Sequence, residues 1–255
     1  MVTLNFTAFL LILVRVTSLF VTTPLLNIKG IPNTLKIMFC IVLSYIIYFS
    51  IASLDIQISV SMATFVVLLI KEALVGLFLG ILVNIVFMSI QMAGQFMDIQ
   101  GGLASSTLFD PMSQNKLSIY GRIYFWIALI LYFIFDGHHY LILAISNSFN
   151  IINISNYNVN FSGLIGAVDI VKQSFVIGVQ IAAPMILVFV ITDLILGIIS
   201  RTVPQLNVLI LGLPMKTLVG IITFLAICPI VVKLILGVLD IIPGNLDNII
   251  KLMSQ

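Results

Sequence analysis

Residues Met62 to Met92 read MATFVVLLIKEALVGLFLGILVNIVFMSIQM, an apolar run that contains only two charged side chains, Lys71 and Glu72. About 20 mostly apolar residues are enough for a helix to cross the ~30 Å hydrocarbon core of a bilayer. This run exceeds that length. It is therefore typical of a helix whose surroundings are lipid or other apolar protein.

The composition of the whole chain agrees with this run. Of its 255 residues, 61% are hydrophobic and 8% are charged, whereas an average soluble domain carries ~25% charged residues. A soluble domain of this size would need more polar side chains to cover its surface. Eleven Lys and Arg against nine Asp and Glu also supply no charge excess of the kind that disordered or nucleic-acid-binding chains have.

Five further apolar runs flank the first, each bounded by polar residues, Pro or Gly. They are about Phe6 to Leu26, Thr34 to Ile51, Leu117 to Phe135, Ser174 to Ser200, and Thr217 to Leu239. We therefore predict an all-α polytopic membrane protein with about six apolar helical segments, forming a single domain over residues 1–255. The most polar stretch, Asn147 to Gly163, is predicted to be a water-exposed loop with an extended segment.

The basic residues favour one orientation of these segments. The first, third and fifth loops with their flanks hold Lys29, Lys36, Lys116, Arg122, Arg201 and Lys216, whereas the remaining loops and the C-terminus hold Lys172, Lys233 and Lys251. Loops rich in Lys and Arg face the cytoplasm. We expect the odd-numbered loops there and both termini outside.

Four charged residues lie inside the apolar runs: Arg15, Lys71, Glu72 and Asp193. A lone charge at the centre of a bilayer costs several kcal/mol unless it is paired or faces a wet interior. Lys71 and Glu72 are adjacent, so they cannot form the i,i+4 pair of a helix. We expect each to pair elsewhere, in interhelical or intersubunit ion pairs that fix an assembly or in a proton pathway. Snorkelling of Arg15 and Lys71 toward the interface is the alternative.

Groups for acid–base or metal chemistry are few. Glu72 is the only glutamate, Cys40 and Cys228 are far apart, and the two histidines are the neighbours His138 and His139. No metal-ligand spacing such as HExxH is present. We therefore predict no catalytic residue, no metal and no cofactor. Asp136 and Gly137 are expected to cap the start of a helix or turn, Asp136 by accepting backbone N–H groups and Gly137 through an unusual backbone angle.

Glycines mark two kinds of feature. Gly76 and Gly80 form a G-x-x-x-G pattern, which lets another helix approach closely. The stretch from Gln91 to Asn115 is rich in small and amide residues, which suits a flexible element that faces a lumen or protein interior rather than lipid; an ordinary loop is the alternative. Its candidate residues are Gly101, Gly102, Ala104, Ser105, Ser106, Phe109, Asp110 and Pro111.

A second irregular segment lies between the fifth and sixth runs. Its residues of interest are Arg201, Pro204, Gln205, Asn207, Gly212, Pro214 and Lys216. Two prolines and a glycine within this interval predict a break in any continuous helix. The segment is expected to be re-entrant or capping, or else a plain loop.

These motifs together resemble the FliR family of flagellar biosynthesis proteins and their counterparts in virulence type III secretion, along most of the chain. The resemblance is carried by Arg15 with Pro24 and Pro32, Glu72 with Gly76 and Gly80, Gln100-Gly101 through Phe109-Asp110-Pro111, Asp136-Gly137-His138-His139, Arg201-x-x-Pro204-Gln205-x-Asn207, and Gly212-x-Pro214-x-Lys216. Two positions depart from the pattern: Asp136 stands where the family often has Asn, and Leu209 where an aromatic is common.

The resemblance implies a structural, non-enzymatic subunit of the protein-export gate in the bacterial inner membrane, within the flagellar basal body. Its implied partners are FliP and FliQ in a hetero-oligomeric ring of helical hairpins, FlhB and FlhA, membrane lipid, and unfolded exported proteins as substrate, without nucleic acid. The loop that matches Gly102 to Lys116 is implied to plug the central channel. An injectisome subunit and, less favoured, a proton-coupled transporter that uses Glu72 and Asp193 are the alternatives.

Overall fold

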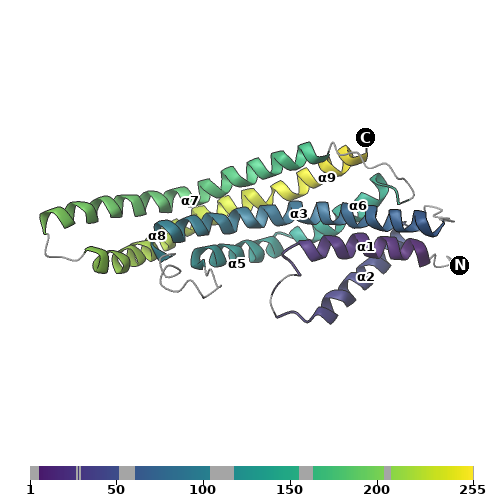
Figure 1. Ribbon diagram of the computed structural model, residues 1–255, viewed down its shortest axis with the longest axis horizontal. Coiled ribbons are helices and arrows are strands. Elements are labelled where there is room, and N and C mark those ends of the chain that lie inside the picture. The colour runs from purple at the N-terminus through teal and green to yellow at the C-terminus, as the bar shows by residue number, and fades with distance from the viewer. Residues whose placement is uncertain are drawn as a thin grey trace. The chain divides into compact units, whose positions relative to one another are not determined.

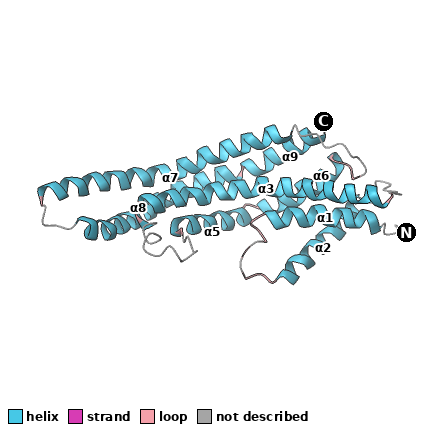
Figure 2. Cartoon of the chain, in the orientation of Figure 1, coloured by secondary structure: helices cyan, strands magenta, loops and turns pink. Residues whose placement is uncertain are grey.

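All regular elements of the described residues are helices (Figures 1 and 2). The computed structural model describes residues 6–26, 28, 30–51, 61–103, 118–154, 163–203 and 208–254. The helices are α1 (Phe6–Thr22), α2 (Asn33–Ile51), α3 (Met62–Gln100), α5 (Ile119–Ile134), α6 (Gly137–Ile151), α7 (Gly163–Thr202), α8 (Val208–Leu239) and α9 (Ile241–Ser254).

The predicted all-α membrane architecture is confirmed. Within the described ranges, four helical stretches are long and apolar enough to cross a membrane: Asn33–Ile51, Met62–Gln100, Gly166–Thr202 and Leu211–Leu252. A fifth is added if the broken pair α5 and α6 counts as one span, and α1 is a shorter apolar helix. Each of the six predicted runs corresponds to a helix, and α3, α7 and α8 extend beyond their runs. The single domain over residues 1–255 stays a prediction.

Helices α3 and α7 are longer than the apolar runs that predict them. Their 39 and 40 residues correspond to roughly 60 Å of helix, about twice the thickness of a hydrocarbon core. The prediction of a non-helical element from Gln91 onward is wrong up to Gln100, because α3 continues through this segment. Side chains such as Gln91 and Gln95 are compatible with a helix that extends beyond the apolar layer.

The prediction of a loop from Asn147 to Gly163 is also wrong at its start, because α6 extends to Ile151. The rest of the predicted loop lies mostly outside the described residues. Likewise Gly212 and Pro214 do not interrupt a helix, since both lie within α8. Proline is tolerated in membrane helices where neighbouring groups satisfy the freed backbone, and Pro184 and Pro229 also lie inside helices.

The described residues divide into two compact units. Unit 1 comprises residues 1–86, 135–171 and 240–255, and unit 2 comprises residues 87–134 and 172–239. In unit 1, α1 packs against α2, and α6 packs against α9. The crossing of α1 and α3 is very close, because a Cβ on Gly76 or Gly80 would overlap atoms of Ser18 and Thr22. This confirms that the G-x-x-x-G pattern serves close helix packing.

Unit 2 has its own core. Helix α5 packs against α8, where the ring of Phe224 lies 5.8 and 5.7 Å from the rings of Tyr120 and Tyr124. Gly94 of α3 meets the backbone of Gly121 in α5 so closely that a Cβ would overlap it. These contacts place the end of α3 beside the start of α5.

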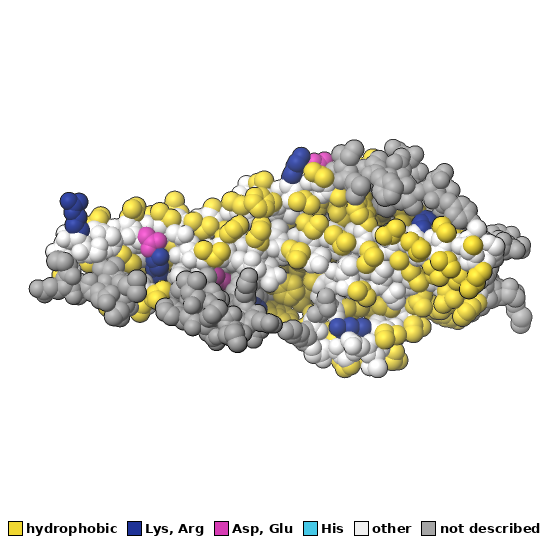
Figure 3. All heavy atoms as spheres, in the orientation of Figure 1, with side chains coloured by type: hydrophobic (Ala, Val, Ile, Leu, Met, Phe, Trp, Pro, Cys, Tyr) yellow, Lys and Arg dark blue, Asp and Glu magenta, His cyan; other side chains and the backbone are white. Residues whose placement is uncertain are grey.

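Much of the surface is apolar, as the face in Figure 3 shows. Large exposed hydrophobic side chains occur along α2, α7 and α8, including Met38, Ile46, Leu194, Ile198 and Leu225. Contiguous apolar surface on this scale is covered by lipid or by other protein. These helices therefore need lipid or other protein to cover their exposed hydrophobic side chains.

Candidate functional site

The first candidate site is a buried charged centre in unit 1. Arg15 of α1 and Glu72 of α3 are fully buried and form an ion pair through Arg15 Nε and Glu72 Oε2. The remaining guanidinium nitrogens donate to Ser148 Oγ at 3.0 Å and to the Ile152 carbonyl oxygen at 3.1 Å. The guanidinium carbon also lies 4.0 Å from the ring centroid of Phe149. The centre therefore joins α1, α3 and α6.

Lys71 completes this centre. Its ammonium lies 3.3 Å from Glu72 Oε1 and donates to the carbonyl oxygen of Asn153 at 2.6 Å. The expectation that Lys71 must pair away from Glu72 is wrong, because a flexible lysine reaches its neighbour without i,i+4 spacing. The carbonyls of Ile152 and Asn153 follow the C-terminus of α6, where the helix dipole favours cations. Snorkelling of Arg15 is excluded by its complete burial.

The second candidate site lies in unit 2, where α3 ends. The amide of Gly101 donates to the Met97 carbonyl at 2.7 Å, and that of Gly102 to the Ile99 carbonyl at 3.2 Å. Gly102 has a φ of +77°, a left-handed conformation that ends helices and favours glycine. A Cβ on Gly102 would also lie 2.8 Å from Leu213 Cδ2 of α8. Residues 101 and 102 therefore form a tight helix end.

A polar clasp holds this helix end. Lys216 Nζ of α8 lies 2.5 Å from Asp193 Oδ1 of α7 and 3.4 Å from the Gln100 carbonyl oxygen. The amide of Gln100 donates to Asp193 Oδ2 at 3.4 Å. The side chain of Lys216 is 17% exposed and that of Asp193 is 41% exposed. We call Gln100, Asp193 and Lys216 the clasp; it connects the last residue of α3 with α7 and α8.

Asp98 joins the end of α3 to the start of α5, on either side of residues Gly101 to Lys116, which we call the glycine-rich stretch. This buried carboxylate accepts from Ser118 Oγ at 2.5 Å and from the backbone amide of Tyr120 at 3.3 Å. Ser118 Oγ in turn accepts from the Gly121 amide at 2.9 Å and caps α5. The sequence interpretation missed Asp98. A carboxylate shortly after an apolar run could have marked Asp98 as a candidate. No feature of the sequence indicated Ser118 as its partner.

Comparison with known proteins places the chain in a family. Residues 6–241 match the family described as bacterial export proteins, family 1. The chain is 32% identical to the flagellar biosynthetic protein FliR of Bacillus subtilis (strain 168), over 98% of this chain and 96% of that protein. The chain belongs to the FliR family of bacterial export proteins.

Other FliR proteins give similar matches. The FliR of Buchnera aphidicola subsp. Baizongia pistaciae (strain Bp) is 31% identical over 85% of this chain and 84% of its own length. The FliR of Escherichia coli (strain K12) is 27% identical over 86% of this chain and 83% of its own length. The resemblance deduced from the motifs is confirmed.

The remaining predicted site residues of this FliR-family chain are distributed as follows. Ala104, Ser105, Ser106, Phe109, Asp110 and Pro111 lie outside the described residues, as do Pro204, Gln205 and Asn207. Arg201 is exposed in the last turn of α7. Gly212 and Pro214 lie near the start of α8 beside Lys216. Of the candidates in the two irregular segments, Gly101, Gly102 and Lys216 therefore lie together at the end of α3, with Asp193 of α7 beside them.

Asp136 starts α6 differently from the prediction. The left-handed residue is Asp136 itself, with φ 57°, rather than Gly137, and its side chain caps no backbone amide. Instead, Asp136 Oδ1 lies 3.0 Å from His139 Nδ1. The prediction of the cap chemistry is wrong because Asp136 has a left-handed backbone, whereas a residue whose side chain caps a helix usually has an extended one.

Asp136, His138 and His139 form the group of described residues that most resembles a set of metal ligands. Candidate ligand atoms of Asp136, His138 and His139 lie within 4.8 Å of one another. The two imidazole centroids are 4.1 Å apart, with the rings inclined by 34°. The absence of a metal stays a prediction.

Proposed function

We propose that this FliR-family chain is a structural subunit of the flagellar type III protein export gate, which lines and plugs the channel for unfolded flagellar proteins. Support comes from FliR proteins related over nearly the whole chain and from helices suited to a membrane. The proposed location is the bacterial inner membrane at the flagellar basal body.

One observation carries the plug assignment. The described residues stop at Leu103 and resume at Ser118, and the carboxylate of Asp98, near the first of these points, binds Ser118 and Tyr120 at the second. The clasp fixes Gln100 just before the stretch begins. A segment with both ends anchored at one place can project from a rigid base. That arrangement suits a plug formed by residues 102–116.

The charges favour a conduit over a transporter or an enzyme. A proton-coupled transporter would need carboxylates that release and take up protons, and Glu72 and Asp193 are the candidates. In this chain Glu72 faces Arg15 and Lys71, and Asp193 faces Lys216. Ion-paired carboxylates suit a structural role. We propose that the chain performs no bond-making chemistry and needs no cofactor.

The exposed apolar faces need partners. Helices α7 and α8 carry many large exposed hydrophobic side chains, which suit helical hairpins packed against other gate subunits. We propose FliP and FliQ as neighbours in the ring, with FlhB and FlhA docked to the assembly. Purification in mild detergent should yield a complex with FliP and FliQ. A monomer or homodimer with solute uptake would favour the transporter.

The plug is tested by removing Ser105 to Ser113 from the full-length chain in its own bacterium. The stretch would no longer fill the channel, so the membrane should leak small solutes, measured as entry of a normally excluded dye. A deletion of residues 155–162, in the polar part of the sequence between α6 and α7, is the matched control. Unchanged permeability of the first variant would overturn the plug assignment, and equal leakage of both variants would also overturn it.

The choice between a flagellar and an injectisome system is tested separately. A strain that lacks the whole chain should have no flagella and no motility. Normal flagella in that strain would assign the protein to an injectisome and leave the channel role untouched.

A further inference from the structure

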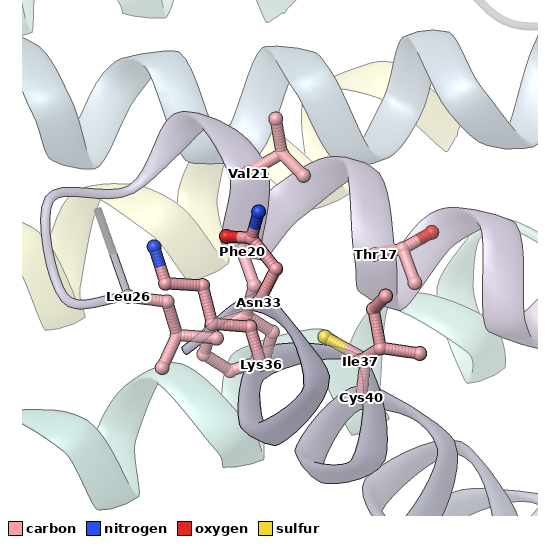
Figure 4. Close-up of a pocket in the computed structure, with 8 residues that line it drawn as sticks. All are labelled: Thr17, Phe20, Val21, Leu26, Asn33, Lys36, Ile37 and Cys40. Atoms are coloured by element: carbon pink, nitrogen blue, oxygen red, sulfur yellow. The ribbon is translucent and has the colours of Figure 1, made fainter. Parts of the chain in front are cut away.

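A groove between the end of α1 and the start of α2 has the features of a lipid site. It has a volume of about 310 Å³ and is lined by Thr17, Phe20, Val21, Leu26, Asn33, Lys36, Ile37 and Cys40 (Figure 4). Small-ligand pockets range from ~300 to 1,000 Å³, so the groove can hold part of an elongated apolar molecule. All of its lining residues belong to unit 1.

The lining of the groove is amphipathic. Phe20, Val21, Leu26 and Ile37 supply apolar walls, and the amino group of Lys36 lies with the amide of Asn33 at one edge (Figure 4). The hydroxyl of Thr17 is already donated to backbone carbonyls of α1, at 2.7 and 3.1 Å. A ligand for this groove therefore needs an apolar body and an anionic end.

The positive charge of Lys36 at this edge favours an anionic ligand. Among the described residues Lys36 has no ion-pair partner, and the first turn of α2 holds no acidic residue. Lys36 lies in that first turn, where the helix dipole is positive and disfavours a cation. Two positive contributions thus coincide beside an apolar groove, and a phosphate group would balance both.

The depth of the groove fits a bilayer lipid. Helix α2 is a candidate membrane span that begins at Asn33, so its first turn belongs at the level of the headgroups. The buried thiol of Cys40 lies one helical turn further along, toward the acyl chains.

We propose that this groove binds an anionic phospholipid, with its phosphate at Lys36 and Asn33 and an acyl chain along Phe20, Ile37 and Cys40. The site is separate from the clasp and does not depend on the proposed channel role. A zwitterionic lipid has the same acyl chains but lacks the net charge that complements Lys36.

Cys40 allows a direct test of occupancy. In a Cys228→Ser background, the full-length chain is purified with its co-purifying subunits and placed in nanodiscs of phosphatidylcholine, with or without phosphatidylglycerol. The rate of alkylation of Cys40 by N-ethylmaleimide is then measured by peptide mass spectrometry. We expect phosphatidylglycerol to slow the reaction by about fivefold, the factor that one lysine–anionic lipid contact supplies.

Three variants sharpen the test. Lys36→Gln should abolish the difference between the two lipids, Lys36→Arg should keep it, and Lys233→Gln, which removes an exposed lysine of α8, should leave it unchanged. Equal alkylation rates in both lipids would mean that another protein or no ligand covers the groove, and would overturn the proposal. Lipid-dependent protection that survives in Lys36→Gln would overturn it as well.

Discussion

Two ion pairs that join different helices in the described part of the chain, Arg15–Glu72 and Asp193–Lys216, differ most in burial. Arg15 and Glu72 in unit 1 are fully buried, and every nitrogen of the guanidinium group has a partner. Asp193 and Lys216 in unit 2 remain 41% and 17% exposed. Both pairs lie in apolar helices, yet only the first is fully buried within the chain. The same chemistry therefore serves two different purposes.

The degree of burial of each ion pair determines how much it contributes to stability. Removing one partner of a buried pair leaves an uncompensated charge and destabilises strongly, whereas an exposed pair contributes ~1 kcal/mol or less because water screens it. The buried centre is thus suited to fix α1, α3 and α6 permanently. The clasp, which is less buried, is expected to hold the end of α3 more weakly, next to the start of the glycine-rich stretch.

The largest expected effect is that of Glu72→Gln. The substitution keeps the shape of the side chain but leaves the charges of Arg15 and Lys71 without their counter-ion. We expect a loss of about 3–5 kcal/mol in the free energy of unfolding, measured by SDS denaturation of the purified chain. Asp240→Asn, at an exposed position, is the control. If Glu72→Gln and Asp240→Asn unfold at the same SDS concentration, the Arg15–Glu72 pair does not stabilise the chain more than the Asp193–Lys216 pair is expected to.

A smaller effect is expected at the helix contact beside the buried centre. Gly76→Ala would force a methyl group into α1, and we expect a destabilisation of about 1–3 kcal/mol from overpacking. Gly197→Ala in α7 meets no atom within 4 Å and should stabilise by about 0.5–1 kcal/mol, because alanine favours helices over glycine. The two variants should thus move the SDS midpoint in opposite directions, and shifts of equal sign would contradict the close crossing.

The sequence predicted the features that depend on local pattern. Apolar runs indicated the membrane helices, the spacing of Gly76 and Gly80 indicated a close crossing, and charges in apolar runs indicated pairing for Glu72 and Asp193. Each of these follows from hydropathy or from helix geometry over a few residues. The existence of charged centres was therefore predictable.

The identity of the partners was not predictable, because it depends on tertiary contacts. Arg15 and Glu72 are 57 residues apart in sequence, and Asp98 is 20 residues from Ser118. No periodic pattern connects such positions. Helix α9 was missed, and α6 was anticipated only as a helix or turn that starts at Asp136 and Gly137, because polar residues interrupt their hydrophobic pattern. Pro214 was misjudged because packing, rather than propensity, decides whether a membrane helix continues.

The smallest stability change, but a clear functional one, is expected at the clasp. Asp193→Asn removes the ion pair and leaves a side chain of the same size, so we expect a loss of at most about 1 kcal/mol in unfolding free energy. The end of α3 would be held less firmly, because Lys216 would no longer be drawn to α7 and Gln100 would lose a charged acceptor. Entry of an excluded dye into cells should therefore increase although the protein remains folded.

A charge reversal separates this explanation from a general loss of packing. The variant that combines Asp193→Lys with Lys216→Asp re-creates the ion pair and should lower the leak again, whereas each single reversal should leak more than Asp193→Asn because it places like charges together. A destabilisation by Asp193→Asn as large as that by Glu72→Gln would show that exposure does not distinguish the two pairs. If the Asp193→Asn variant folds and does not increase dye entry, the clasp has no role in closing the channel. In either case the difference in burial would no longer account for the difference in role.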